Sequence, residues 1–222
     1  MEIRGLALDV HGTLAGESAV PAPDCSPIAV QALLEAHGAS VSYQAWDAAY
    51  RMAFFVDYPR RDAADWRQFL GYAFERLGEP LPAAAREAVI ALFAAQPAMT
   101  VAPDGLRVLR AARERGLRTA AFTTIPRFRV EPLLADVGDL LDLYFDGYEA
   151  RDAKGSRRYY ERLAARLELA PQEILCVGDE PFGDVEMPRR TGMRALLLDR
   201  SGRQSGDEVI QSLDEVARRL MK

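Results

Sequence analysis

Three acidic residues stand where they could do chemistry together. Asp9 ends the apolar run Ile3 to Leu8, and Asp179 and Asp184 follow a second apolar run, 174–178. Apolar runs of this length predict buried strands. Ligands of open α/β sheets bind at the carboxyl ends of the strands, so we expect these carboxylates to lie near one another. Carboxylate oxygens are ligands for hard divalent cations, and a carboxylate can also act as a nucleophile.

The residues after Asp9 are suited to holding an anion. They read Val10-His11-Gly12-Thr13-Leu14. Gly12 permits a sharp backbone turn under a ligand. Thr13 offers a hydroxyl that can hydrogen-bond to an oxyanion. The stretch therefore predicts a carboxylate with an anion-binding loop beside it.

One lysine is unusual in a chain that otherwise uses arginine. Of the 28 basic residues only Lys154 and Lys222 are lysines, and Lys222 is the last residue. Lysine carries a compact charge on a flexible stem, which arginine does not replace. We therefore expect Lys154 to have a specific role.

Four stretches of the sequence resemble motifs of the haloacid dehalogenase superfamily, and the first two lie at residues 6–14 and 120–124. That family's first motif is a hydrophobic strand followed by Asp-x-Asp-Gly-Thr, and residues 6–14 match it except that His11 replaces the second Asp. The second motif is an apolar strand that ends in Thr or Ser. Residues 120–124 match it with Thr123 at the motif position, followed by Thr124 where many members have Asn.

The third and fourth stretches follow in the family's order. Where members often read Glu-x-Gly-x-x-Lys-Pro, residues 149–155 keep the Glu and Lys154, but Arg151 replaces the Gly and the Pro is absent. The fourth motif is a buried strand, then Gly-Asp, then an acid five positions later, which here gives Asp179 and Asp184. In family members these acids hold Mg²⁺.

The resemblance implies an Mg²⁺-dependent phosphatase that cleaves a small phosphate monoester through an aspartyl-phosphate. Histidine, with an unperturbed pKa of about 6.5, can donate and accept the proton that the missing Asp would handle. The implied catalytic residues are Asp9, His11, Thr123 and Lys154. The implied phosphate-binding residues are Gly12, Thr13 and Thr124. The implied metal ligands are Asp9, His11 (through its carbonyl), Asp179 and Asp184.

Other activities of the same superfamily are weighed against this one. Dehalogenases place Tyr at the position of His11 and attack carbon without a metal, which Asp179 and Asp184 argue against. Phosphonatases need a lysine in the helical insertion, and residues 18–97 contain none. A degenerate, weakly active or binding protein stays open, because the second, third and fourth motifs are altered.

The elements that must position these residues predict an α/β fold, a Rossmann-like parallel sheet covered by helices, with an inserted four-helix cap domain. The α/β core is expected at 1–16 and 99–222, and the cap at 17–98. Helices of the cap are expected to begin near Ile28, Ser42, Asp65 and Pro82. In the core, strands are expected at 3–8, 117–124, 143–145, 174–178 and 195–198, and helices at 104–115, with Asp104 as its cap, 127–137, 156–167, 184–191 and 207–220.

Arginines near the expected cleft are candidates for substrate recognition. Tyr58 to Arg61 reads as a polar turn between cap helices, and arginine suits carboxylate or phosphate groups. Arg60 in that turn, together with Arg127 and Arg129 after the second motif, are therefore expected to contact substrate.

Composition narrows the classes of function. The net charge is −5 and the basic residues are scattered, so no nucleic-acid partner is expected. There is no run that could span a membrane and no leader pattern, and two cysteines give no disulfide framework. We expect a cytoplasmic monomer or homodimer whose partner is a small phosphorylated metabolite.

Overall fold

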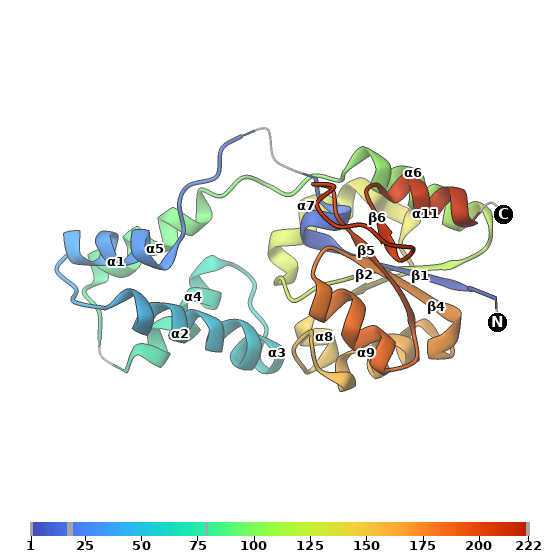
Figure 1. The fold of residues 1–222 in the computed structure, drawn as a ribbon. Coiled ribbons are helices and arrows are strands. Elements are labelled where there is room, and N and C mark those ends of the chain that lie inside the picture. Colours follow the sequence, from blue (N-terminus) through green and yellow to red (C-terminus); the bar gives the residue numbers. More distant parts are fainter. Residues whose placement is uncertain (1, 17–19, 79, 221–222) are drawn as a thin grey trace.

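A six-stranded parallel sheet forms the centre of the protein, as a computed structural model shows (Figure 1). The structure describes residues 2–16, 20–78 and 80–220. The strand order is β3-β2-β1-β4-β5-β6. The strands are β1 (Gly5–Asp9), β2 (Arg118–Phe122), β3 (Leu143–Phe145), β4 (Ile174–Gly178), β5 (Arg194–Leu198) and β6 (Val209–Ile210).

The register of the central strands brings the predicted site residues to one edge. Asp9, the last residue of β1, pairs with Phe122, so Thr123 comes directly after it on β2. Leu8 pairs with Val177, so Asp179 lies just beyond the end of β4. Asp9, Thr123 and Asp179 therefore lie at the same end of the sheet, as the sequence predicted.

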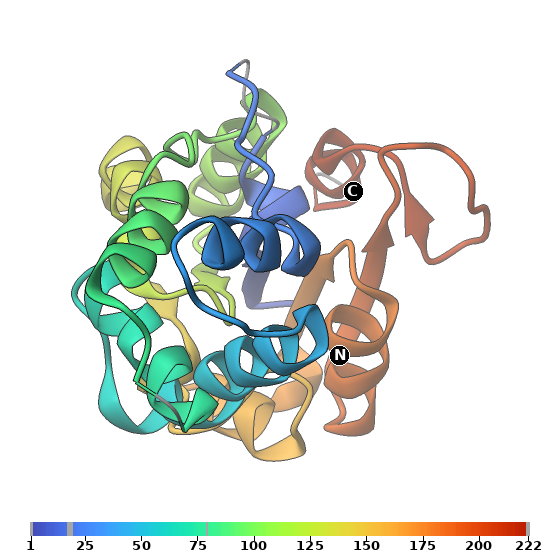
Figure 2. The same ribbon diagram turned by 90° about the vertical axis from the view of Figure 1, so that its left-hand side faces the viewer.

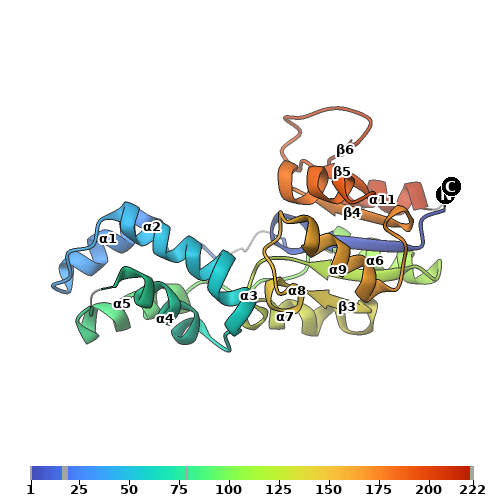
Figure 3. The ribbon, with the colours of Figure 1, turned by 90° about the horizontal axis from the view of Figure 1, so that it is seen from below.

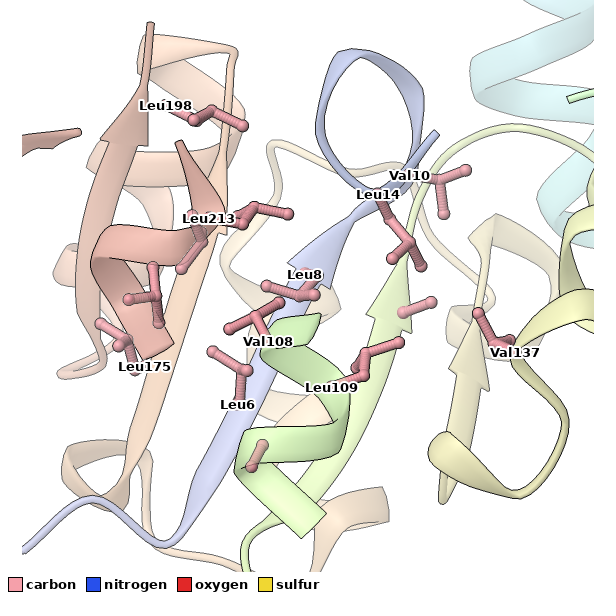
Figure 4. Packing of buried hydrophobic residues seen from close by; sticks show 14 of the residues in the cluster. Leu6, Leu8, Val10, Leu14, Val108, Leu109, Val137, Leu175, Leu198 and Leu213 are labelled. Carbon is pink, nitrogen blue, oxygen red and sulfur yellow. The ribbon is translucent and has the colours of Figure 1, made fainter. Parts of the chain in front are cut away.

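Helices cover both faces of the sheet. On one face α6 (Pro103–Glu114), α7 (Arg127–Val137) and α11 (Leu213–Leu220) pack on the apolar side chains of β1, and Figure 4 shows Leu6 and Leu8 beside Val108 of α6. On the other face α9 (Arg157–Leu167) contributes Tyr159 and Tyr160 to a second core. The short helices α8 (Gly147–Ala150) and α10 (Met187–Arg190) flank α9.

A separate helical lobe lies beyond the carboxyl ends of the strands (Figures 1, 2 and 3). Its helices are α1 (Pro27–Ala36), α2 (Tyr43–Met52) with its continuation Ala53–Asp57 and α3 (Tyr58–Arg61), α4 (Trp66–Leu77) and α5 (Ala83–Ala94). They have a core of their own, built around Trp46, Phe69 and Phe93. Ser42 and Asp65 cap α2 and α4 with side-chain hydrogen bonds, as their sequence positions predicted.

Two chain connections join the lobe to the sheet. They pair side by side where they meet the core: Gly16 N donates to Thr100 O (3.0 Å) and Ala102 N donates to Leu14 O (2.8 Å). The expected domain boundaries stay a prediction, and residues 17–19 at the first boundary lie outside the described residues. No helix among the described residues is long and apolar enough to cross a membrane.

Three local expectations are wrong. Tyr58 to Arg61 is a helical turn rather than a loop, because it continues α2 and buries Tyr58 and Pro59 against the core. The segment 207–220 is not one helix, since β6 adds to the sheet edge before α11 begins. Asp104 does not cap α6, whose N-cap is Ala102; its carboxylate instead accepts from Leu213 N (3.0 Å).

Candidate active site

The predicted lysine and carboxylates meet at the carboxyl end of β1. Lys154 Nζ donates to Asp9 Oδ1 and lies 2.6 Å from Asp184 Oδ1. Asp9, Asp179 and Asp184 each offer an oxygen, and these oxygens all lie within 4.8 Å of one another. Asp9 is 3% exposed and Asp184 is fully buried, whereas Asp179 is exposed at the rim. Residues as far apart in the sequence as Asp9 and Asp184 therefore form one charged cluster.

The cluster carries more negative than positive charge. Burial raises the pKa of Asp9 to about 7, with Lys154 opposing the rise and Asp184 adding to it. Burial likewise raises the pKa of Asp184. Burial opposes protonation of Lys154, but the carboxylates of Asp9 and Asp184 outweigh it and raise the pKa of the ammonium. Two buried carboxylates thus share one ammonium, which favours binding of a further cation or proton.

The segment Val10–Leu14 makes the sharp turn that Gly12 predicted. Gly12 has φ +77°, and a Cβ at this position would overlap the carboxylate of Asp179. Thr13 is fully buried, and its hydroxyl has no hydrogen-bond partner among the described residues. His11 is exposed and lies outside the buried cluster. Thr13 therefore offers a free buried hydroxyl beside Asp9.

Thr123 is fixed at the end of β2. It is 2% exposed, and its hydroxyl accepts from Ile125 N (3.1 Å). The Tyr159 hydroxyl accepts from Thr123 N (3.0 Å) and lies 2.9 Å from the carbonyl oxygens of Thr123 and Phe145. Thr124, the neighbouring candidate, is half-buried.

Sequence reasoning missed the residues that shape the loop around Asp184. The side chain of Glu180 accepts from Phe182 N (3.1 Å) and from Gly183 N, and Tyr160 donates to Gly183 O. Asp184 itself accepts from Glu180 N through Oδ2 (2.9 Å). Glu180 is visible in the sequence as an acid before Pro181, but nothing there marks Tyr160, which reaches the loop only because α9 packs beneath it.

A protein-family model matches most of the chain. Residues 3–192 match the model of haloacid dehalogenase-like hydrolases. The chain belongs to this family.

Two curated relatives of this haloacid dehalogenase-like hydrolase are named phosphatases. A phosphoserine phosphatase of Thermus thermophilus is 31% identical over 134 residues, covering 60% of this chain and 54% of the relative. The phosphatase MT3486 of Mycobacterium tuberculosis is 33% identical over 118 residues, covering 51% and 53%. The chain thus spans about half the length of the curated relatives it matches.

Solved structures establish the fold alone. A 2-haloacid dehalogenase of Pseudomonas syringae has a TM-score of 0.66 at 16% identity, covering 99% of this chain and 98% of that one. Other similar structures include both phosphatases and dehalogenases. The fold therefore does not choose between these two activities.

Among the described residues, no hydrogen bond or ion pair joins the arginine candidates of this hydrolase to the clustered carboxylates. Arg60 is exposed on α3. Arg127 is exposed with its guanidinium 5.5 Å from the ring centre of Tyr144. Arg129 donates to Pro97 O (3.3 Å) and to Gln96 Oε1 (3.2 Å), which ties α7 to the second connection. Their role in substrate binding stays a prediction.

A hollow of about 960 Å³ opens beside the site. It is lined by Asp179 of the cluster and by His11 and Gly12 of the turn, and it extends past Arg129 toward Arg200. Asp9, which is buried and pairs with Lys154, does not line it. His11 therefore lines a space large enough for a small organic molecule.

Proposed function

We propose that this hydrolase is an Mg²⁺-dependent phosphatase that cleaves a small phosphorylated metabolite. The observation that carries the proposal is the convergence of Asp9, Asp179 and Asp184, of which Asp9 and Asp184 contact the Lys154 ammonium. Thr13 adds a free hydroxyl. The phosphatase names of both curated relatives support it.

The residues present fit a divalent cation. Asp184 Oδ1 is buried, and its one close partner within the described chain is the Lys154 ammonium, 2.6 Å away, which Asp9 shares. Asp9, Asp179, Asp184 and the backbone carbonyl of His11 would hold the ion, a donor set made only of oxygens, as Mg²⁺ prefers. When bound, Mg²⁺ neutralises charge and polarises a phosphoryl oxygen.

The chain's own groups account for the rest of the reaction. Lys154 opposes the rise that burial causes in the pKa of Asp9 and attracts the phosphoryl oxygens, and Thr13 donates its free hydroxyl to one of them. Asp9 attacks phosphorus, the bond to the ester oxygen breaks, and His11 gives a proton to the departing alcohol. Water then attacks the aspartyl-phosphate, giving its proton to His11, which frees inorganic phosphate and restores Asp9.

A dehalogenase is the second candidate. Lys154 already neutralises one carboxylate of the pair Asp9 and Asp184, which is what attack on carbon without a metal would need. In that reaction Asp9 would displace a halide from the carbon beside a carboxylate and form an ester that water cleaves.

Two product assays on the same protein separate these candidates. A phosphatase releases phosphate from an aryl phosphate, loses activity in EDTA and regains it with Mg²⁺. A dehalogenase releases halide from a 2-haloacid and is indifferent to EDTA. Asp9→Asn should abolish either activity.

Metal dependence is tested with a pair of acids in one segment. Asp184→Asn should weaken activation by Mg²⁺ by about 10-fold or more. Glu186→Gln is the matched control, because Glu186 is an exposed acid two residues later that pairs with Arg190 on the surface. Phosphate release that persists in EDTA, or equal effects of the two variants, would defeat the proposal.

A further inference from the structure

Arg200 binds the back of the turn that follows the nucleophile. Its Nε donates to Gly12 O (3.2 Å) and its Nη2 donates to Thr13 O (2.8 Å). Arg200 comes from the loop after β5, nearly 190 residues further along the chain. The planar guanidinium therefore holds two successive carbonyls in one orientation.

The hydrogen bonds from Arg200 to the carbonyl oxygens also fix the direction of the N–H groups in the same peptide planes. In a planar trans peptide the C=O and the following N–H point in opposite directions. Because Gly12 O points toward Arg200, the N–H of Thr13 points away from it. Gly12 also contacts the Asp179 side closely, since a Cβ there would overlap that carboxylate. The Thr13 amide is thus held on the side of the turn opposite to Arg200.

Arg200 is itself held rigidly. Its guanidinium makes two hydrogen bonds to Asp104, from Nη1 to Oδ2 (2.9 Å) and from Nη2 to Oδ1 (3.1 Å). Asp104 is 6% exposed and also accepts from Ser212 Oγ (3.1 Å) and Leu213 N (3.0 Å). One buried carboxylate therefore links α6, the start of α11 and the turn after β1 through Arg200.

A second ion pair joins the same two helices without touching the turn. Arg107 of α6 makes two hydrogen bonds to Asp214 of α11, both of 2.8 Å. The Arg107–Asp214 pair therefore also attaches α11 to α6, but it has no contact with the turn after β1. The distinguishing feature of Arg200 is its contact with the carbonyls of Gly12 and Thr13.

We propose that Arg200 is a positioning residue, which sets the peptide planes of Gly12 and Thr13 so that the amide and hydroxyl of Thr13 face the transferring phosphoryl group. This inference rests on the proposed phosphatase function. Misplacing such donors by about 1 Å costs on the order of 100-fold in rate. Arg200 acts through Thr13 and does not touch the substrate's phosphorus.

The test compares Arg200→Gln with Arg107→Gln, using an aryl phosphate with Mg²⁺. Arg200→Gln should lower kcat by about 10- to 100-fold with a smaller change in KM, while Arg107→Gln keeps kcat within about 2-fold. Unfolding in urea is measured on both, so that kcat is compared under conditions where both are folded. Equal losses of kcat would overturn the inference.

Two further measurements cover the remaining outcomes. Arg200→Lys keeps the positive charge but loses the fork, so it should still show at least a 5-fold lower kcat; full activity would refute a positioning role. Affinity for inorganic phosphate, measured by calorimetry, needs no turnover: Arg200→Gln should bind about 10-fold more weakly and Arg107→Gln should bind normally. Inactive wild-type protein would thus count against the phosphatase proposal, while equal phosphate affinity in both variants would count against the role of Arg200.

Discussion

Replacing Lys154 by Met should destabilise the protein more strongly as the pH rises. Methionine has a similar length and no charge, so it fills the space but leaves Asp9 and Asp184 facing each other without a cation. Both carboxylates are buried, and Lys154 Nζ lies 2.6 Å from Asp184 Oδ1. Removing one partner of a buried charge pair costs about 3–5 kcal/mol when the other charge is retained.

Protonation limits that cost at low pH. A buried carboxyl that has lost its cation can become neutral by taking up a proton. This protonation costs about 1.4 kcal/mol for each pH unit above the pKa of the carboxyl in the unfolded chain. Asp9, whose pKa is raised to about 7, is already largely protonated in the wild type at pH 5, so Asp184 is the carboxyl that must take up a proton when the lysine is lost. From the ordinary value of 3.8, neutralising Asp184 costs about 2 kcal/mol at pH 5 and nearly 6 kcal/mol at pH 8. The penalty of Lys154→Met should therefore be about 2 kcal/mol at pH 5, where protonation is cheaper, and about 3–5 kcal/mol at pH 8.

Urea unfolding at pH 5 and pH 8, in EDTA, measures this difference. The wild type is expected to lose stability itself as the pH rises from about 4 to 7, because a carboxyl with a raised folded pKa favours folding only while it is protonated. Arg157→Met is the matched control, since Arg157 pairs with Glu161 on the surface and should change stability by less than about 0.5 kcal/mol at either pH. A pH-independent penalty for Lys154→Met would refute this account of the cluster.

Three other expectations follow from particular contacts. Gly12→Ala should lower kcat by about 100-fold, measured by phosphate release, because the added Cβ overlaps the Asp179 carboxylate and φ is +77°. Magnesium affinity, measured by calorimetry, should rise with pH up to about 7, because the ion must displace the proton that the raised pKa of Asp9 retains; a flat profile would contradict this. Tyr58→Phe should cost about 1–3 kcal/mol in urea unfolding, because Asp146 Oδ2, 2.6 Å from the Tyr58 hydroxyl, and Arg127 N both lose a buried partner.

The sequence predicted the residues that stand at strand ends. Asp9, Thr123 and Asp179 each follow an apolar run, and parallel strands place such residues at one edge of the sheet. Lys154 could be singled out because the chain uses arginine elsewhere. These are local signals, since each needs only the few residues around it.

Residues that act across the fold gave no such signal. Arg200 is one arginine among 26, and its contacts with Gly12 and Asp104 depend on how the loop after β5 folds over the turn. Asp104 looked like a helix cap because it follows a proline, yet its carboxylate is used by Arg200 and Leu213. An acidic residue near the start of a helix can cap that helix or bind a residue far away in the sequence. The local pattern is the same in both cases and cannot distinguish them.

Charge balance within the cluster is the strongest physical reason to favour a cation-dependent reaction. With Lys154 as the one cation beside them in the described chain, ionising both Asp9 and Asp184 costs free energy, because burial raises the pKa of each carboxyl. A nucleophile held partly protonated near neutral pH is a poor one. A divalent cation shared with Asp179 would add two positive charges to the same group of oxygens, so that Asp9 is ionised when substrate arrives. A dehalogenase built on these residues would have to work with that surplus carboxylate uncompensated, and its rate should then rise as the pH passes about 7.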